Sequence, residues 1–374
     1  MLVTRVQISA APLKLKMKSG RRKKEEGAGA MSVAKYAYAY ARVRVRLAEC
    51  LSAGKLRSLA EAKDWSEFFS SLLDSGYKER LARLTPEKAD TRTLEIALRE
   101  DLVAAYEMVL RSVHAKKLRN FFYELFRRLE VKNLKALLRA KMRGFPVDTS
   151  SFYPVEGFFK RRISALADAE SLDALFNRLN EPYKSVLHAH IASGNILVLE
   201  HALDEEIYGA IFERAKQLSA EDERIVHSLV GSEIDIVNIM TILRCKKDGI
   251  PAEEMRNLFL LPQFAFKFKQ EDARDAIFAE NVADAVQSLP EDFKFLEESL
   301  AEYEVENSLV PFENALWRNF YEHVRDVLRG YPLNIGTIVG FLYLKEMEIR
   351  NIRAIAVCKE HGIPSENVMK MVFF

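Results

Sequence analysis

The sequence lacks the motifs that most catalytic and metal-binding sites require. Its three cysteines, Cys50, Cys245 and Cys358, are scattered singly, so we expect no disulfide framework, no cysteine zinc site and a reducing, cytoplasmic setting. It contains no Gly-x4-Gly-Lys-Ser/Thr phosphate loop, no His-Glu-x-x-His zinc motif, no Asp-Asp-x-x-Asp magnesium motif and no Gly-x-Ser-x-Gly nucleophile elbow. We therefore expect no catalytic residues, no bound cofactor and no bound metal.

Long apolar runs and a large excess of one charge are missing as well. The longest apolar candidate, residues 335–344, is too short to span a bilayer and contains two glycines. The chain has 56 basic and 54 acidic residues, but residues 1–30 hold eight of the basic and two of the acidic ones, which leaves −4 for the remainder. A nucleic-acid binder normally presents a basic face, so no such partner is expected. The length of 374 residues exceeds what one compact core usually holds.

The two N-terminal segments differ in what they predict. Residues 1–30 are basic and glycine-punctuated with little to pack, so we expect a disordered extension, for which Met31 offers an alternative start. A solvated tail is the preferred interpretation, and attraction to anionic lipid stays open. Residues 36–47 alternate like a strand but also repeat at steps of four and three, and their alanines favour the helix that we predict.

The rest of the chain repeats one pattern three times. In each copy an acid precedes an asparagine by three residues, and a Gly-apolar-Pro phrase begins eleven residues after it. Glycine permits the left-handed turn that ends a helix, and proline prevents the helix from resuming. The repeat-defining residues are Asn133, Gly144 and Pro146, then Asn238, Gly249 and Pro251, and finally Asn351, Gly362 and Pro364.

Other landmarks recur in the same register. A helix-capping residue (Asp64, Ser171, Asn281), an aromatic residue (Tyr77, Tyr183, Phe293) and the glutamate of an apolar-Glu-x-Ala-Leu phrase (Glu95, Glu200, Glu313) precede each asparagine. Glutamate and asparagine are 38 residues apart in every copy. Helix-period segments such as 102–142 and 220–247 dominate, and strand signals are scarce. The sequence therefore predicts an all-α fold of three homologous lobes, 31–148, 149–253 and 254–374, around a pseudo-threefold axis.

Two sets of polar residues have alternative interpretations. Each of the three asparagines is expected to bridge to a neighbouring helix or turn of its own lobe, and the alternative is that they point into a central hole and touch a partner. Near the C-terminus lie Lys345, Glu346, Glu348, Arg350 and Arg353. Lys345 with Glu348, and Glu346 with Arg350, are at helical pair spacing, which makes a solvated or self-paired face the default for this cluster. A partner interface is the alternative.

Two stretches resemble the C subunit of the archaeal-type (V/A-type) ATP synthase, which is related to the d subunit of the vacuolar ATPase. They are Tyr-Ala-Tyr-Ala-Tyr-Ala-Arg-Val-Arg, residues 36–44, and Lys-Glu-Met-Glu-Ile-Arg-Asn-Ile-Arg, residues 345–353, with the Gly-Ile-Pro phrase that follows. Together with the triplicated pattern, the resemblance covers roughly residues 32–374, and the basic tail departs from it.

The resemblance implies a funnel-like, all-α rotor subunit without an active site. Such a subunit sits on the cytoplasmic end of the membrane proteolipid ring, receives the central stalk in its hollow and couples the two during proton or sodium transport linked to ATP synthesis or hydrolysis. It is a peripheral membrane protein whose partners are the central-stalk subunits and the ring, with no nucleic acid or small-molecule substrate. Two alternatives remain: a helical scaffold or adaptor unrelated to rotary ATPases, and an all-α enzyme, which the missing ligand motifs disfavour.

Overall fold

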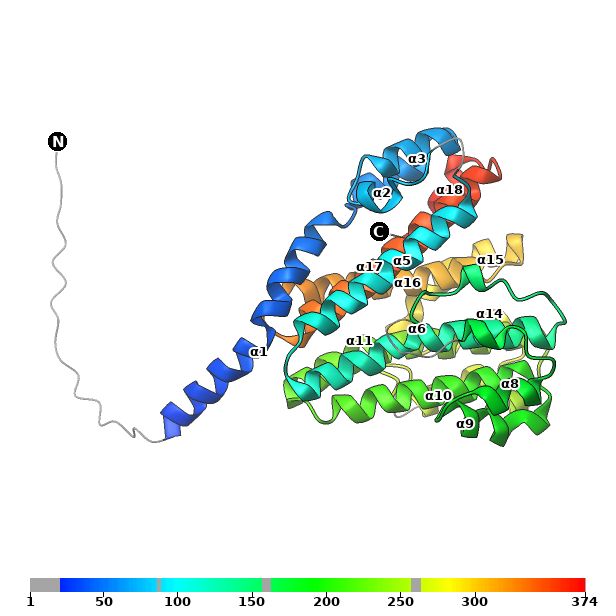
Figure 1. The fold of residues 1–374 in the computed structure, drawn as a ribbon. Helices are drawn as coiled ribbons and strands as arrows, with labels where there is room; N and C mark the ends of the chain where they lie inside the picture. The colour runs from blue at the N-terminus through cyan, green and yellow to red at the C-terminus, as the bar shows by residue number, and fades with distance from the viewer. Residues whose placement is uncertain (1–20, 86–88, 157–162, 257–263, 374) are drawn as a thin grey trace, which may run out of the picture.

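The chain folds into helices throughout the part that the structure describes. The computed structural model describes residues 21–85, 89–156, 163–256 and 264–373 (Figure 1). No strand occurs within these ranges. The all-α class predicted from the sequence is therefore confirmed.

Six long helices follow the N-terminal helix α1 (Arg21–Glu49) and come in three consecutive pairs. The pairs are α5 (Thr91–Ser112) with α6 (Lys116–Met142), α10 (Ile196–Ala215) with α11 (Ala220–Lys247), and α16 (Val310–Arg329) with α17 (Ile335–Glu360). The shorter α-helices are α2 (Ala53–Glu61), α3 (Trp65–Leu73), α4 (Lys78–Leu81), α8 (Leu172–Arg178), α9 (Tyr183–His190), α12 (Ala252–Arg256), α13 (Gln270–Phe278), α14 (Val282–Gln287), α15 (Leu300–Glu306) and α18 (Ser365–Met371). The 3-10 helices are η1 (Thr149–Ser151), η2 (Ser164–Leu166), η3 (Ile191–Ser193) and η4 (Glu291–Ser299).

Helix α1 confirms one N-terminal prediction and begins earlier in the chain than the sequence suggested. Residues 36–47 are helical as predicted, and Tyr36, Ala39 and Val43 form its buried face. The helix already begins at Arg21, within the stretch expected to be disordered, while residues 1–20 lie outside the described residues. The reason is local, because residues 21–26 are all arginine, lysine or glutamate, which are good helix formers.

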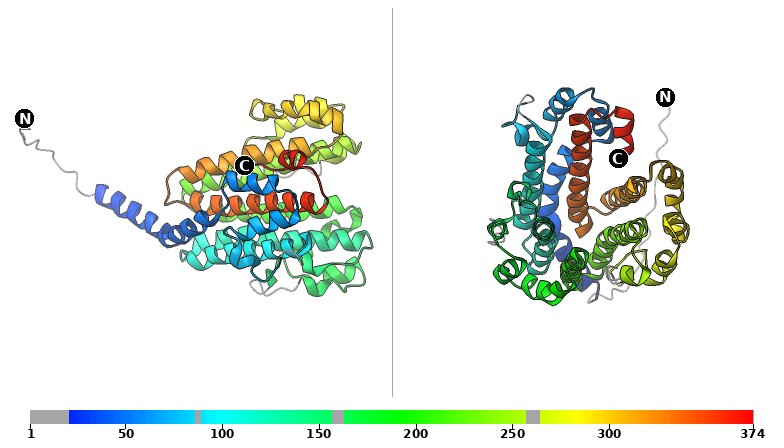
Figure 2. Two further views of the ribbon diagram at one scale, coloured as in Figure 1. Left: turned by 90° about the horizontal axis from the view of Figure 1, so that it is seen from above. Right: turned by 90° about the vertical axis from the view of Figure 1, so that its right-hand side faces the viewer.

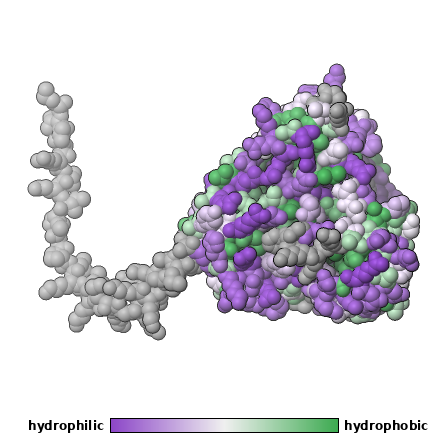
Figure 3. Space-filling view, in the orientation of Figure 1, coloured by the Kyte–Doolittle hydropathy of each residue, from purple (hydrophilic) through white to green (hydrophobic). Residues whose placement is uncertain are grey.

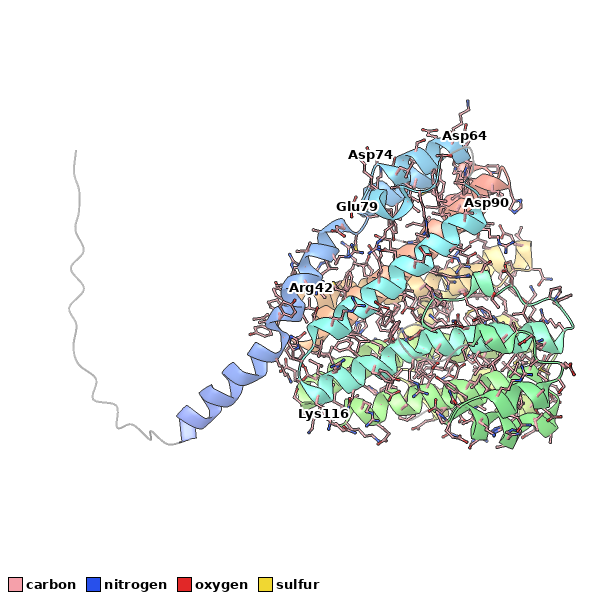
Figure 4. The ribbon with its side chains drawn as sticks, viewed as in Figure 1. Arg42, Asp64, Asp74, Glu79, Asp90 and Lys116 are labelled. Carbon is pink, nitrogen blue, oxygen red and sulfur yellow. The ribbon has the colours of Figure 1, made fainter. Side chains whose placement is uncertain are left out.

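The three predicted helix starts are present. The side chains of Asp64, Ser171 and Asn281 accept hydrogen bonds from backbone N–H groups in the first turns of α3, α8 and α14 (Figure 4 labels Asp64). Ser219 caps α11 in the same way. These bonds satisfy N–H groups that the helix itself leaves without acceptors.

The three Gly-x-Pro phrases end α6, α11 and α17 with the same turn. Gly144, Gly249 and Gly362 have φ values of 68°, 68° and 65°. In each turn the N–H of the following residue donates to the carbonyl five residues before it, as from Ile363 to Cys358 at 2.8 Å. This is the Schellman arrangement, which satisfies the last carbonyls of a helix.

The long helices pack across the boundaries of the sequence units, because the last long helix of each unit contacts the first long helix of the next. Helix α10 packs along α6, α16 packs on both α11 and α17, and α5 packs on α17. Thus the helix that ends one sequence unit contacts the helices that begin the next. The last long helix, α17, packs on α1, α2, α3 and α5, and α18 packs on α2, so the C-terminal end completes the N-terminal part (Figure 2, right).

Helix α17 is enclosed on nearly all sides. Its glycines allow α16 to approach, because a Cβ at Gly336 would lie 2.7 Å from Val327 and one at Gly340 would lie 3.0 Å from Leu328. The segment 102–142, which has a continuous helical period, is interrupted between Ser112 and Lys116, where the chain turns from α5 into α6. The hydrophobic core thus lies between long helices that are far apart in the sequence.

The exterior is mainly hydrophilic, with scattered apolar residues on the face shown in Figure 3. Among the described helices, only α11 is long and apolar enough to cross a membrane. Two thirds of its most apolar stretch is buried inside the protein, as is usual for a core helix.

Candidate functional site

The five charged residues predicted near the C-terminus separate into an inner and an outer group. Lys345 and Glu348 are buried, with exposed fractions of 6% and 4%, and only 15% of the Glu346 side chain is exposed. These three therefore bind other parts of the chain, as the self-paired interpretation requires. Arg350 and Arg353 keep 39% and 45% of their side chains exposed, so only these two remain open to a partner.

Lys345 stands at the centre of a buried ion cluster. Its Nζ lies 2.8 Å from Asp101 on α5 and 3.0 Å from Glu348 one turn along α17, and it donates to the Tyr77 hydroxyl at 2.8 Å. The Tyr77 hydroxyl donates in turn to Glu348 at 2.6 Å. Burial alone would lower the pKa of Lys345, but Glu348 and Asp101 raise it, so the ammonium stays charged.

The Lys345 cluster joins the third sequence unit to the first, and a second cluster occupies the equivalent positions between the first and second units. Arg127 stands 218 residues before Lys345, which is the interval between Asn133 and Asn351. Its guanidinium bonds Glu206 on α10 at 3.2 Å and the Tyr183 hydroxyl at 3.2 Å. The Tyr183 hydroxyl donates to Glu130 at 2.9 Å. Two of the three recurring aromatic residues therefore bind the acid that precedes a recurring asparagine.

A third cluster joins all three sequence units at one repeat position. Arg128, Glu233 and Glu346 each lie five residues before a recurring asparagine, on α6, α11 and α17. Arg128 pairs with Glu233 and, at 2.8 Å, with Glu346. Tyr343 donates to Glu233 at 2.7 Å and Tyr106 donates to Glu346 at 2.6 Å. The three longest helices of the repeats are thus tied together by their own equivalent residues.

The charge balance at Glu346 favours its ionised form. Burial alone would raise the pKa of this carboxyl, but the nearby Lys132 ammonium and Arg128 guanidinium lower it to about 2. Lys132 approaches to 3.1 Å and keeps 40% of its side chain exposed. This third cluster of Arg128, Glu233 and Glu346, which we call the central cluster, is therefore charged at neutral pH. It opens toward the surface on the Lys132 side.

The recurring glutamates form a partly exposed belt with arginines from the long helices. Glu200 binds Arg139 through both oxygens, at 2.5 and 2.7 Å, while Glu313 binds Arg350 at 2.6 Å and Arg244 at 3.2 Å. Glu95 pairs with Arg353. We call this set the arginine–glutamate belt; its members are Glu95, Glu200, Glu313, Arg139, Arg244, Arg350 and Arg353.

Part of the belt borders a pocket between α6, α10 and α11. The pocket has a volume of about 390 Å³, and Arg139, Glu200 and Arg244 line it. Arg128 and Glu233 of the central cluster line it as well. Both acidic and basic side chains line this recess, and between 39% and 57% of each belt arginine is exposed. Such a surface suits a protein partner with charges of both signs.

Two of the recurring asparagines hold the chain that follows their helix. The Asn133 side chain exchanges two hydrogen bonds with the Tyr153 backbone, both 2.8 Å long. Asn351 binds the Phe373 backbone in the same two-bond way, and its Oδ1 accepts at 3.1 Å. Asn238 is buried too. Asn351 bridges within its own predicted lobe, as expected from the sequence, whereas Asn133 binds Tyr153, which lies just beyond the predicted end of its lobe. Burial removes all three asparagines from any partner surface.

Sequence reasoning missed Arg139 and Arg244 and the role of the recurring glutamates. The recurrence of Glu95, Glu200 and Glu313 was visible, but it served only to set the repeat register. Their partners escaped notice because Arg139 stands 61 residues before Glu200, in the preceding unit. Within the described residues, no group of three or more histidines, cysteines or acids is arranged to hold a metal ion.

Comparison with known proteins places these features in one family. The family model for the ATP synthase (C/AC39) subunit matches residues 39–371. The chain is similar to the C subunit of the A-type ATP synthase from Methanothermobacter thermautotrophicus, with 29% identity over 330 residues that cover 85% of each chain. It is equally similar, at 29% identity, to the C subunits of the A-type ATP synthases from Desulfurococcus sp. and Thermococcus onnurineus, with 87% of this chain and 86% of each relative covered.

Proposed function

This chain belongs to the ATP synthase (C/AC39) subunit family, and we propose that it works as a non-catalytic central-stalk component of a V/A-type ATP synthase or ATPase. It couples the stalk to the membrane proteolipid ring during proton or sodium transport linked to ATP synthesis or hydrolysis. The observation that carries the proposal is the arginine–glutamate belt beside its pocket. A partner that enters this recess meets charges of both signs in fixed positions, which set its orientation.

The buried ion clusters support a role in transmitting force. A coupling subunit must pass torque between two partners without its own helices sliding past one another. Arg128 ties α6 to both α11 and α17, and Lys345 ties α17 to α5. Because breaking a buried ion pair leaves an unpaired charge, such cross-links resist relative movement of the helices.

The proposal defines the partners and the place of the protein. We propose that the chain folds as three lobes around a hollow, that the stalk enters this hollow, and that the opposite end rests on the proteolipid ring. The protein is then a peripheral component at the cytoplasmic face of the membrane. Its named relatives are parts of A-type ATP synthases, which supports partnership with the other subunits of such a complex.

The test reverses one pair of the belt and then restores it. R139E alone opposes Glu200, whereas R139E combined with E200R keeps an internal ion pair and inverts its direction on the surface. We expect the double variant to regain the melting temperature of the wild type but to copurify poorly with stalk and proteolipid subunits from membranes, by a factor of about ten.

The outcomes separate the competing functions. If the double variant assembles as well as the wild type, the belt serves only the fold and the proposed interface is wrong. If the wild-type chain itself fails to copurify with stalk and proteolipid subunits, a helical adaptor unrelated to rotation replaces the rotor proposal.

A further inference from the structure

The Lys345 and Arg127 clusters have a third equivalent position, between the second and third sequence units, and there the ion cluster is absent. Where Lys345 and Arg127 supply a cation, the third equivalent is Ser232, and where Asp101 and Glu206 supply an acid, it is Asn319. The corresponding aromatic residue is Phe293, which has no hydroxyl. Only the acid before the recurring asparagine remains, as Asp235. Compared with the other two clusters, this position therefore lacks one cationic side chain, one acidic side chain and one hydroxyl group.

A cavity of about 220 Å³ occupies the place of the missing cluster. Ser232, Asp235, Phe293 and Asn319, which are the four equivalent positions, all line it. Shorter side chains at the cation and acid positions explain why space is left. The volume is below the roughly 300 Å³ of the smallest pockets for drug-sized ligands, so it suits a single side-chain head group.

The polar atoms around the cavity can accept hydrogen bonds. Asp235 is held by backbone N–H groups of residues 266–268 at 2.9 to 3.2 Å, and burial raises its pKa to about 6 despite these bonds. Ser232 donates its hydroxyl proton to the Ser228 carbonyl at 2.7 Å, which leaves its oxygen free to accept. Within the described residues no cationic side chain bonds Asp235: Lys267, which also lines the cavity, pairs with Asp292 at 2.6 Å, and the charge of Lys269 lowers the pKa of Asp235 less than burial raises it. This carboxyl is therefore less fully neutralised than Glu348.

His323 adds an acceptor that has no partner within the described residues. Its Nε2 atom is buried and makes no hydrogen bond there, while its ring bonds the Ser228 backbone, so Nδ1 carries the proton. Burial lowers the pKa of His323, which keeps the ring neutral and Nε2 able to accept. Exposed Glu322 and Asp326 also line the cavity. These two acids pair with Arg325 at 3.6 Å and Arg329 at 3.0 Å, and Lys267 lines the cavity as well, so the site offers acceptors inside and charges of both signs around it.

We propose that the cavity bounded by Ser232, Asp235, Asn319 and His323 binds the ammonium or guanidinium group of a basic ligand. At the two equivalent positions the chain supplies this group itself, from Lys345 and Arg127. A ligand with several N–H donors matches carboxylate, amide, hydroxyl and imidazole acceptors, whereas hard metal cations prefer a full set of oxygen ligands. This inference stands independently of the proposed rotor function.

The first experiment uses small cations that differ in their N–H groups. Methylguanidinium and propylammonium chloride are titrated onto the full chain, and backbone amide shifts of Phe266, Lys267 and Phe268 are followed by NMR. Tetramethylammonium chloride at the same concentration is the control, because it carries the same charge but no donor. We expect saturable shifts with the first two salts and none with the control.

Two substitutions test whether the cavity is the site. S232R places a guanidinium at the position of Arg127 and should abolish the response to both probes, whereas S66R adds the same charge at an exposed serine elsewhere and should leave it unchanged. N319D restores the acid that Asp101 and Glu206 provide. It should tighten probe binding by roughly fivefold, as expected for one added charge-assisted hydrogen bond at a partly exposed site.

The results decide both the site and the source of the ligand. Equal shifts with tetramethylammonium, or an unchanged response in S232R, would mean that the cavity holds only water and would overturn the proposal. If S232R also weakens copurification with other subunits, the basic group belongs to a partner protein. If S232R assembles normally but has lost probe binding, the ligand is a free amine.

Discussion

At the scale of single residues, the Tyr77 hydroxyl links two buried charges of opposite sign. It accepts from Lys345 and donates to Glu348. We expect Y77F to lower the free energy of unfolding by about 1–3 kcal/mol, because both charged groups lose a hydrogen bond while the ring still packs. Urea unfolding measures this. Y303F is the matched control, since the Tyr303 ring packs on Phe312 while its hydroxyl bonds none of the described residues, and a comparable loss there would contradict the expectation.

Glu346 makes the stability of the protein sensitive to acid. Its pKa falls from 4.5 to about 2 in the folded protein, so its ionisation stabilises the fold above about pH 4.5, and this contribution is lost as the pH falls toward 2. The shift corresponds to about 3 kcal/mol, and Lys132, being partly exposed, reduces this through solvent screening.

The substitution E346Q isolates this contribution. At pH 7 the variant should unfold at a lower urea concentration than the wild type, because Arg128 loses one of its two charged partners and keeps only Glu233. The difference should shrink as the pH falls from about 5 to about 2, where the wild-type carboxyl is protonated as well. E304Q, at an exposed position, serves as the control. A difference that is independent of pH would show that Glu346 acts through packing and not through its charge.

At the scale of elements, the three Gly-x-Pro turns permit a direct comparison. A Cβ at Gly144, Gly249 or Gly362 would meet no atom within 4 Å, so only the positive φ opposes a side chain. Replacing any of them with alanine should cost about 1 kcal/mol, and replacing it with asparagine should cost less. Thermal unfolding of the six variants measures this. Unequal costs for the three alanine variants would contradict a shared turn.

The starts and ends of helices were predictable because their causes are local. Asp64 and Gly362 act on backbone groups within a few residues, and spacing along the chain is enough to find them. The beginning of α1 lies upstream of the predicted helix because the basic stretch, despite its two glycines, opens with six charged helix formers. The boundary between α5 and α6 was hidden because the apolar period continues through it.

The partners of the charged residues were predictable only within one helix, because the other partners depend on which helices meet. Helical spacing paired Lys345 with Glu348, which the structure confirms at 3.0 Å. It also paired Glu346 with Arg350, but in the structure Glu346 binds Arg128 from α6 and Arg350 binds Glu313 from α16. Spacing also gave no sign that α17 is enclosed, which is what buries Lys345 among acids. The absence of an ion cluster between the second and third units became visible only once the contacts of the Lys345 and Arg127 clusters were known. Ser232 and Asn319 carry no signal by themselves.

At the scale of the whole molecule, the chain closes on itself. Because the last long helix of each unit packs on the first long helix of the next, α1 and α5 at the start of the chain pack on α17, near the C-terminus. Arg128 then connects the three units at one point. A chain arranged in this way completes its N-terminal part last during synthesis. A part cut at the sequence boundaries, such as residues 31–148, would expose the faces of α1 and α5 that α17 covers.

Truncation after Gly362 tests this closure. It removes α18, which packs on α2, and Phe373, which binds Asn351 and stacks against Trp317. The buried Asn351 amide loses both bonds, at a cost of about 1–3 kcal/mol. Amide hydrogen exchange in α2 and α3, some 300 residues away in sequence, should therefore accelerate roughly tenfold or more. Helices α8 and α9, which do not contact α18, provide the internal control. Equal acceleration in both regions would indicate general destabilisation, and unchanged exchange in α2 would show that the N-terminal helices are stable without the C-terminus.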